Sequence, residues 1–358
     1  MELLSVTMND GVMPRSEIEG KDNSSEDKSN YKVVLSGDMV YNSMRMWQGA
    51  NGISPCDGIV SPAYTVLMPK IPIINGYFAA LFKSPNLINE FRKNSQGMTS
   101  DTWNLKYPQI ETIKVSIPSI SEQERIADML GTIDQRITKQ AQLVDSLKKY
   151  KRGVMQHIFH QHDAQGDEVW TCVRLGDIFK KVSRRNTNGM VKNVITNSAE
   201  YGLIPQRDFF DKDIAVDGNT TNYYVIEEGD FVYNPRKSNT APYGPFNRYT
   251  LSERGIISPL YTCLVLQADI NPSYLAWYFR SDAWHRYIYD NGSQGVRHDR
   301  VSMTDDLLMG IPVMFPDNTK QQVYADILDK IEARLQAAQK EYELLTKAKD
   351  GYVQQLFI

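Results

Sequence analysis

The chain contains an internal duplication, and this feature constrains its fold more than any other. Gly11–Pro14 (GVMP) returns as Gly202–Pro205 (GLIP), and Gly37–Asn42 (GDMVYN) returns as Gly229–Asn234 (GDFVYN). The further pairs, in the same order, are Gly58–Pro62 with Gly255–Pro259, Ser95–Gly97 with Ser293–Gly295, Ile126–Leu130 with Tyr324–Leu328, and Gly153–Phe159 with Gly351–Phe357. A repeat this long is not that of a solenoid, whose units have about 20–50 residues. The sequence therefore predicts two similar modules, each long enough for its own core, in a pseudo-two-fold internal repeat.

The composition is that of a globular protein. Of the 358 residues, 41% are hydrophobic and 23% are charged, and no apolar run is long enough to cross a bilayer. Met1–Leu4 does not begin a signal peptide, so we expect a cytoplasmic protein without membrane contact. Cys56, Cys172 and Cys263 have neither disulfide nor metal-ligand spacing and are expected to be buried apolar residues.

The charge distribution limits how the chain could bind nucleic acid. The net charge is −3, and no segment is globally basic. Basic side chains do cluster locally, between Arg280 and Arg300. A DNA-binding surface would therefore be a local face, helped by a more basic partner.

Strand-like runs open each globular part and helix-like runs close it. Tyr31–Leu35 and Met39–Tyr41 are typical strands on either side of a Gly-Asp turn, and the second copy repeats this pattern. Tyr77–Phe91 then favours a helix with a break at Ser84-Pro85, as does Tyr274–Tyr289. The globular parts are therefore predicted to be mixed α/β, with antiparallel rather than doubly wound sheets.

A long helix is predicted after each globular part. Ser121 followed by Glu124 is a capping box, which opens a helix. Residues 122–159 would make a rod on the order of 55 Å long, at about 1.5 Å per residue. Pairing with 320–357 as a coiled coil would hold the globular parts on the order of 50 Å apart. The predicted apolar stripes are Ile126, Leu130, Ile133, Ile137, Ala141, Val144, Leu147, Val154 and Ile158 in the first copy, and Leu328, Ile331, Leu335, Ala338, Tyr342, Leu345, Tyr352 and Leu356 in the second.

These patterns predict an α+β fold with two α/β domains separated by two long antiparallel helices. The expected globular domains are residues 1–115 and 163–315, and the expected helices are residues 116–162 and 316–358.

The helix sequence carries a resemblance to a known family. Ser121–Asp134 (SEQERIADMLGTID), preceded by Ile117-Pro118, closely resembles the conserved helix of DNA specificity subunits of type I restriction-modification systems. The GDMVYN, GIVSP and SQG strings look like those of the target recognition domains in the same family, and the resemblance covers essentially the whole chain.

This resemblance implies a non-enzymatic subunit. Its two target recognition domains would each read half of a split site in double-stranded DNA. Its helices would act as a spacer and as the dock for two DNA adenine methyltransferase subunits. Those subunits, and not this chain, would hold S-adenosylmethionine, so no cofactor is expected here. A restriction subunit would join the assembly.

One departure from the family pattern concerns the first domain. Trp170–Asp177 (WTCVRLGD) resembles the usual start of a target recognition domain, and the first copy has no counterpart because Met1 aligns near residue 192. We therefore expect the start of the first domain to be shortened.

Polar side chains that follow the matched strands are the best candidates for DNA contacts. Arg, Lys, Gln and Asn read guanine and adenine edges, and these residues diverge between two otherwise matched copies, as two readers of different half-sites should. The glycine-flanked Gln96 and Gln294 would let backbone approach a phosphate, and the basic residues beside them would position the duplex. All could equally be solvated loop residues. The candidates are Arg45, Trp47, Gln48, Lys93, Asn94, Gln96, Arg236, Lys237, Asn239, Gln294, Arg297, His298 and Arg300.

Catalytic and metal-binding alternatives find less support. His157, His160 and His162 lie at a helix end, and Gln355 replaces the first of them in the second copy, which disfavours a metal site. Asp10 with Glu19-Gly-Lys21 imitates a nuclease motif but does not recur.

A methyltransferase site is also disfavoured. Asn234-Pro235 is followed by Arg236, and no glycine-rich cofactor loop precedes it. The remaining alternatives are an enzyme with its own nuclease or DNA-modification site and a coiled-coil scaffold for protein interactions.

Overall fold

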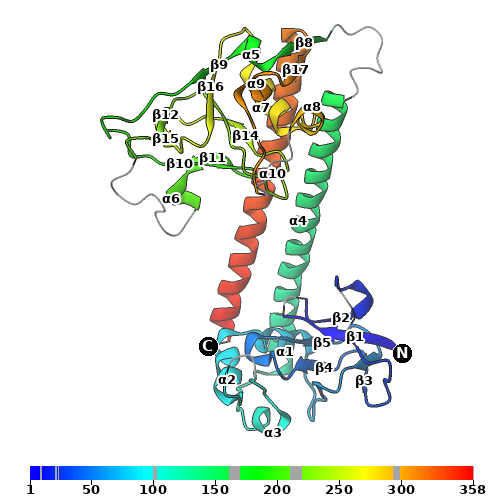
Figure 1. The fold of residues 1–358 in the computed structure, drawn as a ribbon. Coiled ribbons are helices and arrows are strands. Elements are labelled where there is room, and N and C mark those ends of the chain that lie inside the picture. Colours follow the sequence, from blue (N-terminus) through cyan, green and yellow to red (C-terminus); the bar gives the residue numbers. More distant parts are fainter. Residues whose placement is uncertain are drawn as a thin grey trace. The chain divides into compact units, whose positions relative to one another are not determined.

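The computed structural model describes residues 1–8, 10–20, 22, 24–99, 103–160, 170–209, 220–292 and 299–357 (Figure 1). The chain forms two compact units. Unit 1 consists of Met1–Val144 and Ala337–Ile358, and unit 2 consists of Asp145–Gln336. Each unit therefore contains one of the predicted globular domains and parts of both long helices.

The described residues of unit 1 form two small sheets. The first has the order β2-β1-β6-β3, in which β1 and β6 are parallel, and the second has the antiparallel order β5-β4-β7. The strands are β1 (Glu2–Val6), β2 (Val12–Pro14), β3 (Lys32–Val34), β4 (Met39–Asn42), β5 (Asn51–Ile53), β6 (Gly58–Val60) and β7 (Tyr64–Leu67). The short helices are η1 (Arg15–Glu17), η2 (Met46–Gln48), α1 (Asn75–Leu81), α2 (Pro85–Asn94) and α3 (Tyr107–Ile110).

Unit 2 repeats this plan with additional strands. Its largest sheet has the antiparallel order β14-β13-β16-β9, and β10-β11, β12-β15 and β17-β8 form pairs. The strands are β8 (Thr171–Arg174), β9 (Phe179–Val182), β10 (Ile195–Ser198), β11 (Gly202–Pro205), β12 (Tyr224–Ile226), β13 (Phe231–Tyr233), β14 (Phe246–Arg248), β15 (Gly255–Ile257), β16 (Thr262–Leu266) and β17 (Pro312–Phe315). The short helices are α5 (Leu175–Ile178), α6 (Gln206–Phe209), α7 (Pro272–Arg280), α8 (His285–Asn291) and α9 (Asp305–Met309).

The Gly-Asp turn has the same role in both units. Gly37 and Gly229 both have a φ of 94°, a backbone angle that residues other than glycine rarely adopt. The next residue caps the turn, because Asp38 Oδ2 accepts from Leu35 N at 2.9 Å, as Asp230 does from Glu227 N. The predicted strands and the helix break at Ser84-Pro85 are confirmed. The turn does not close a hairpin, however: β3 and β4 belong to different sheets.

The two long helices are α4 (Ile120–His160) and α10 (Asn318–Leu356). The predicted capping box at Ser121 is wrong by two residues. Ser119 caps α4, since its side chain accepts from Glu122 N at 3.4 Å, and the equivalent Asp317 accepts from Thr319 N at 2.9 Å.

The helices are antiparallel within each unit. In unit 1, Asp134 of α4 pairs with Lys349 of α10 at 2.5 Å, and Gln140 Nε2 donates to Ala338 O at 2.8 Å. In unit 2, Lys151 of α4 pairs with Glu332 of α10 at 2.8 Å. Increasing numbers on α4 therefore meet decreasing numbers on α10, as predicted.

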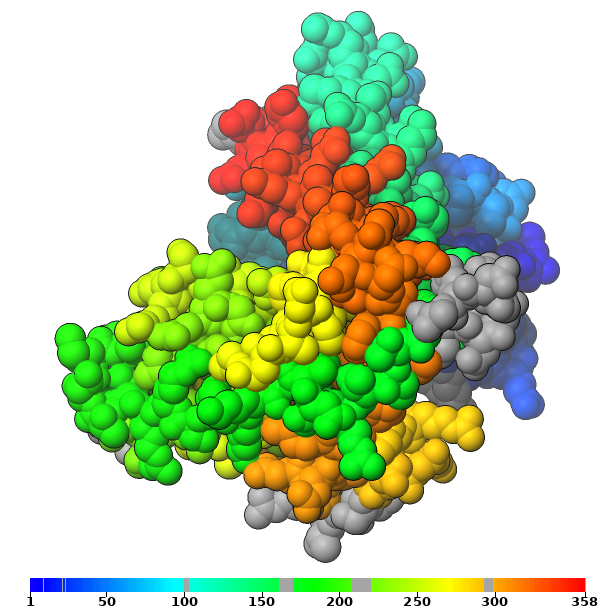
Figure 2. All heavy atoms as spheres, turned by 90° about the horizontal axis from the view of Figure 1, so that it is seen from above, coloured from blue at the N-terminus to red at the C-terminus, as the bar shows by residue number. Residues whose placement is uncertain are grey.

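A buried glutamine fixes the start of each long helix to the preceding globular part. Gln123 Oε1 accepts from Ile74 N at 3.1 Å, and Gln321 Oε1 accepts from Asn271 N at 2.8 Å. Each amide also donates to the carbonyl of the proline before the helix, at 2.9 and 2.8 Å. In unit 2, α7 lies beside this first part of α10 (yellow and orange, Figure 2), where Trp277 Nε1 donates to Asp329 Oδ1 at 2.7 Å.

The far end of each long helix is buried in the other copy's core. Phe159 of α4 lies in the core of unit 2, with its ring 5.7 Å from that of Tyr274. Phe357, which follows α10, lies in the core of unit 1, with its ring 5.3 Å from that of Tyr77. The duplicated strings Gly153–Phe159 and Gly351–Phe357 therefore make equivalent contacts.

The apolar stripe predicted for the end of α10 is wrong by one position. Tyr352 and Leu356 are 45% and 37% exposed, whereas Val353 and Phe357 are buried. The stripe shifts by one residue after Lys349, whose ammonium group pairs with Asp134. The earlier apolar positions Leu328, Ile331, Leu335 and Ala338 are buried as predicted. Tyr342 is 37% exposed and Leu345 is half-buried, so the predicted stripe is wrong at Tyr342 as well.

The expected lack of membrane-spanning helices and the expected burial of the three cysteines can be compared with the structure. Within the described ranges, none of the helices has the length and apolar content needed to cross a bilayer. Cys263 is buried and Cys56 is half-buried, but Cys172 is exposed, because β8 pairs only with β17 and presents this side chain outwards.

Lys83 makes the stability of unit 1 depend on pH. Its Nζ donates to Met8 O and Gly49 O, both at 2.6 Å, and burial together with Lys349 lowers the pKa of Lys83 to about 8 from 10.5. Between those values the unfolded chain binds more protons, so the free energy of unfolding should rise with pH. We expect the urea unfolding midpoint of the native chain to rise between pH 7.5 and 9.5 relative to the midpoint of the Lys83→Met variant. If the two midpoints instead changed in parallel with pH, the pKa of Lys83 would not be lowered.

Candidate functional site

Each unit joins two loops through the same backbone contact. In unit 1, Ser43 O, just after β4, accepts from Leu105 N at 2.8 Å. In unit 2, Pro235 O, just after β13, accepts from Val301 N at 2.8 Å. The loop after this strand therefore meets the loop after the Ser-Gln-Gly string in both copies. These are the two regions that the sequence singled out separately.

An asparagine shapes the start of this loop in both copies. Asn42 Oδ1 accepts from Met44 N at 3.0 Å, and Asn234 Oδ1 accepts from Arg236 N at 3.0 Å. Exposed arginines follow this local turn in both copies, Arg45 in the first and Arg236 in the second. It gives the amide of Asn234 a structural role.

In unit 1 the junction forms a cluster of aromatic and polar side chains. Trp47 and Trp103 meet edge to face with ring centroids 5.1 Å apart, and the guanidinium of Arg92 lies 5.7 Å from the Trp103 ring centroid. Arg45 is exposed beside them, and its Nη1 donates to Gln48 Oε1 at 3.4 Å. Arg45, Trp47 and Gln48 therefore lie in one exposed or half-exposed cluster, and their contact with DNA stays a prediction.

The second loop of unit 1 presents Gln96. Its backbone exchanges two hydrogen bonds with Asn104, at 3.0 and 2.8 Å, which leaves the side chain exposed. Lys93 and Asn94 lie nearby at the end of α2 but make local contacts. Lys93 Nζ pairs with Glu90 at 2.7 Å, and Asn94 Nδ2 donates to Glu90 O at 2.9 Å.

In unit 2 the junction carries two arginines. Arg236 and Arg300 form an isolated antiparallel bridge, and Lys237 N donates to Asp299 O at 2.9 Å. Tyr261 lies close by: burial raises the pKa of its hydroxyl, and the charges of Arg236 and Arg300 oppose that rise. The exposed Arg236 and half-buried Arg300 thus form one basic site.

A groove of about 470 Å³ opens beside this basic site. Lys237 and Asn239 line one part of it, and Tyr289 and Asp299 line another. Tyr289 is 68% exposed. Of the remaining predicted residues, Gln294, Arg297 and His298 lie outside the described part of the chain.

Three contributing residues were not predicted from the sequence: Arg92, Trp103 and Tyr289. Arg92 and Trp103 join the cluster only through a contact between α2 and a distant loop, so no local pattern marks them. An exposed tyrosine next to the basic run after Arg280 could have signalled Tyr289. A planar aromatic side chain among arginines and amides suits contact with nucleotides.

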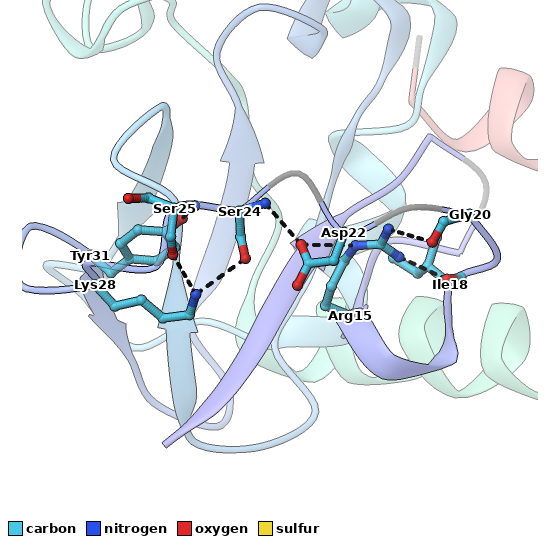
Figure 3. Close-up of polar contacts among 8 residues, drawn as sticks. All are labelled: Arg15, Ile18, Gly20, Asp22, Ser24, Ser25, Lys28 and Tyr31. Carbon is cyan, nitrogen blue, oxygen red and sulfur yellow. Dashed lines mark hydrogen bonds and ion pairs between the residues drawn. The ribbon is translucent and has the colours of Figure 1, made fainter.

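The residues of the alternative catalytic sites lie only partly among the described residues. No group of three His, Cys, Asp or Glu side chains among them could hold a metal ion, and His162 and Lys21 lie outside the described ranges. In and beside the loop around Glu19, the side chains of Arg15 and Lys28 donate hydrogen bonds to backbone carbonyl groups (Figure 3). Arg15 donates to Ile18 O at 2.7 Å and Gly20 O at 3.1 Å, and Lys28 Nζ donates to Ser25 O at 2.7 Å.

Comparisons with known proteins agree with one another. Residues 6–149 match the family model described as "Type I restriction modification DNA specificity domain". The type I restriction enzyme MjaVIII specificity subunit of Methanocaldococcus jannaschii is 23% identical over 85% of this chain and 75% of its own length.

Solved structures show the same fold. The type I restriction-modification system S subunit from M. genitalium matches with a TM-score of 0.56 and 15% identity, over 91% of this chain and 84% of its own. A chain from work on complex assembly and conformational transition of the type I R-M system matches with a TM-score of 0.56 and 16% identity, over 93% and 84%.

Proposed function

Because the chain belongs to the specificity subunits of type I restriction-modification systems, we propose that each unit reads one half of a split DNA site. The single observation that carries this proposal is the repeated loop junction with different side chains. The hydrogen bond from Leu105 N to Ser43 O in unit 1 is matched by the one from Val301 N to Pro235 O in unit 2. The two copies then present different groups at equivalent places.

The side chains at the two junctions suit different targets. Unit 1 presents Arg45, Trp47 and Gln48, whereas unit 2 presents Arg236, Lys237 and Asn239. An amide pairs well with the major-groove edge of adenine, and arginine or lysine pairs well with guanine. A shared scaffold with divergent contact groups supports one reader for each half-site. Comparing genomic methylation with and without this chain, alongside its partner subunits, should reveal one split motif that depends on it.

The proposed partners follow from the family and the pseudo-two-fold repeat. We propose that α4 and α10 act as the spacer and dock two DNA adenine methyltransferase subunits, and that restriction subunits complete the assembly. S-adenosylmethionine would then bind the methyltransferase subunits. This chain would contribute recognition and no catalytic group. Cleavage or methylation of DNA by the purified chain alone would instead support the rival assignment to an enzyme.

The stoichiometry of the complex is a direct expectation. Each long helix carries an equivalent buried glutamine near its start, Gln123 or Gln321, and an equivalent buried phenylalanine stands at or just after its end, Phe159 or Phe357. A partner that recognises one such arrangement should recognise its repeat. We expect native mass spectrometry of the co-expressed proteins to show two methyltransferase subunits per chain. A stable complex with one such subunit would contradict equivalent docks.

A further inference from the structure

Three buried asparagines of unit 2 form one hydrogen-bonded network next to the loop that carries Arg236 and Lys237. Asn197 lies in β10, Asn247 lies in β14 and Asn234 directly follows β13. Burying an amide costs free energy unless its oxygen and its nitrogen both have hydrogen-bond partners. Both atoms of all three side chains have such partners. A fully satisfied buried network of this kind holds one arrangement of the elements that it joins.

Asn197 connects the β10-β11 pair to the larger sheet of unit 2. Its Nδ2 donates to Val232 O of β13 at 2.9 Å, and its Oδ1 accepts from Asn247 Nδ2 of β14 at 2.7 Å. Asn247 Nδ2 also donates to Ser198 O at 3.0 Å. Among the described residues, no backbone ladder joins these two sheets. The amide side chains therefore supply hydrogen bonds between two sheets that the backbone does not pair.

Arg280 sets the direction of the hydrogen bonds in this network. A guanidinium group can only donate, so Asn247 turns its oxygen towards Arg280 Nε, at 3.3 Å. The nitrogen of Asn247 then faces the oxygen of Asn197, and Asn197 directs its own nitrogen to Val232 O. The guanidinium of Arg280 also lies 5.2 Å from the ring centroid of Trp277, which favours its position at the end of α7.

The network ends at the loop with the proposed base contacts. Asn234 Nδ2 donates to Asn197 O at 3.4 Å, and Asn234 Oδ1 accepts from Arg236 N at 3.0 Å. One buried side chain therefore bonds both to β10 and to the backbone of Arg236. The side chain of Arg236 is exposed, so the buried contacts of this arginine are made through its backbone.

Unit 1 lacks the two strand amides of this network. Val6 and Gly52 stand at the positions of Asn197 and Asn247, as the strand registers show. Gly52 lets two backbones approach closely, because a Cβ atom there would lie 2.8 Å from Gly11 Cα. The matching strands of unit 1 therefore meet by direct backbone packing, and the amide network is a property of unit 2.

We propose that Asn197 and Asn247 are positioning residues for half-site reading by unit 2. They hold Asn234, which in turn fixes the backbone from which Arg236 extends towards DNA. A base-edge contact needs a precisely placed side chain, and buried hydrogen bonds around the contacting residue supply that placement. This inference rests on the proposed half-site reading.

The first test follows amide hydrogen exchange at Asn234–Lys237 in the full chain without DNA. Asn247→Ala leaves the buried oxygen of Asn197 without its donor, so exchange should become at least about tenfold faster. Asn247→Asp should have the same effect in a side chain of nearly equal size. Its carboxylate stays ionised beside Arg280 and cannot donate to Asn197. This second variant keeps the test decisive if Asn247→Ala does not fold.

Tyr274→Phe is the matched control for the loss of a buried hydrogen bond. It removes the bond from the Tyr274 hydroxyl to Met314 O, at 2.9 Å, which is not part of the network. This variant should lower the free energy of unfolding and leave exchange at Asn234–Lys237 unchanged. An equal increase of exchange in Tyr274→Phe and Asn247→Ala, or no increase in either Asn247 variant, would overturn the positioning role.

The second test measures discrimination between cognate and altered duplexes by the assembled complex. Both Asn247 variants should reduce discrimination at least about fivefold, and only at the half-site that unit 2 reads. Tyr274→Phe should leave it unchanged. The Arg236→Ala and Lys237→Ala pair is measured alongside. If this pair loses discrimination and the Asn247 variants do not, the positioning role is wrong and half-site reading stands. If the pair itself keeps full discrimination, half-site reading by this loop falls, and the positioning role falls with it.

Discussion

Phe159→Ala should destabilise unit 2 by about 3–5 kcal/mol, although Phe159 belongs to the helix that follows the first globular part. Its side chain is 2% exposed and packs on Tyr274 and Tyr278, both 5.7 Å away between ring centroids. Truncation would leave a cavity in a tightly packed aromatic core. By the same reasoning, Phe357→Ala should destabilise unit 1. Urea unfolding followed by hydrogen exchange can assign each loss to its unit.

Exposed tyrosines on the same two helices provide controls. Tyr150 and Tyr352 are 60% and 45% exposed, so Tyr150→Ala and Tyr352→Ala should each change stability by less than about 0.5 kcal/mol. A larger loss from Tyr352→Ala than from Phe357→Ala would contradict the observed position of the apolar stripe. Loss of protection in unit 1 after Phe159→Ala, with unit 2 unchanged, would contradict the crossed arrangement of helix ends.

Combined Arg236→Ala and Lys237→Ala should weaken specific DNA binding by the assembled complex about 5- to 150-fold. This range corresponds to about 1–3 kcal/mol for a base-edge contact. Arg236 is exposed beside Arg300, and Lys237 lines the groove with Asn239. A contact with phosphate would instead weaken all sequences alike and reduce the salt dependence. Titrations of cognate and altered duplexes at several salt concentrations separate the two outcomes.

Lys180 provides the matched control for these variants. It is an exposed lysine of β9 in the same unit, away from the loop junction. Lys180→Ala removes one positive charge and should leave the discrimination between duplexes unchanged. Equal loss from Lys180→Ala and the double variant would assign the effect to net charge rather than to the junction.

The sequence alone predicted the architecture because its signals extend over long stretches. The duplication and the apolar stripes predicted two modules and two antiparallel helices, because a pattern that repeats over tens of residues is reliable even where single positions are ambiguous. Such a long pattern does not reveal a shift of the apolar stripe by one residue. The stripe continues through Tyr352 and Leu356 about as well as through Val353 and Phe357, and only packing against Tyr77 distinguishes them.

Contacts between distant segments could not be predicted in this way. The sequence marked Gln48 and Gln96 separately, and only the hydrogen bond between Leu105 N and Ser43 O shows that the loops near them are joined. Trp103 carries no local signal and enters the cluster through its contacts with Trp47 and Arg92.

The central claim, that each unit reads its own half-site, is tested most directly by methylation profiling of single-unit variants. The assembled complex would carry Gln48→Ala in one experiment and the Arg236→Ala and Lys237→Ala pair in another, and methylated motifs would be compared across a genome. We predict that Gln48→Ala relaxes the bases at one half of the split motif, and that the unit 2 variant relaxes only the other half. Equal loss of discrimination at both halves from either variant would contradict the account.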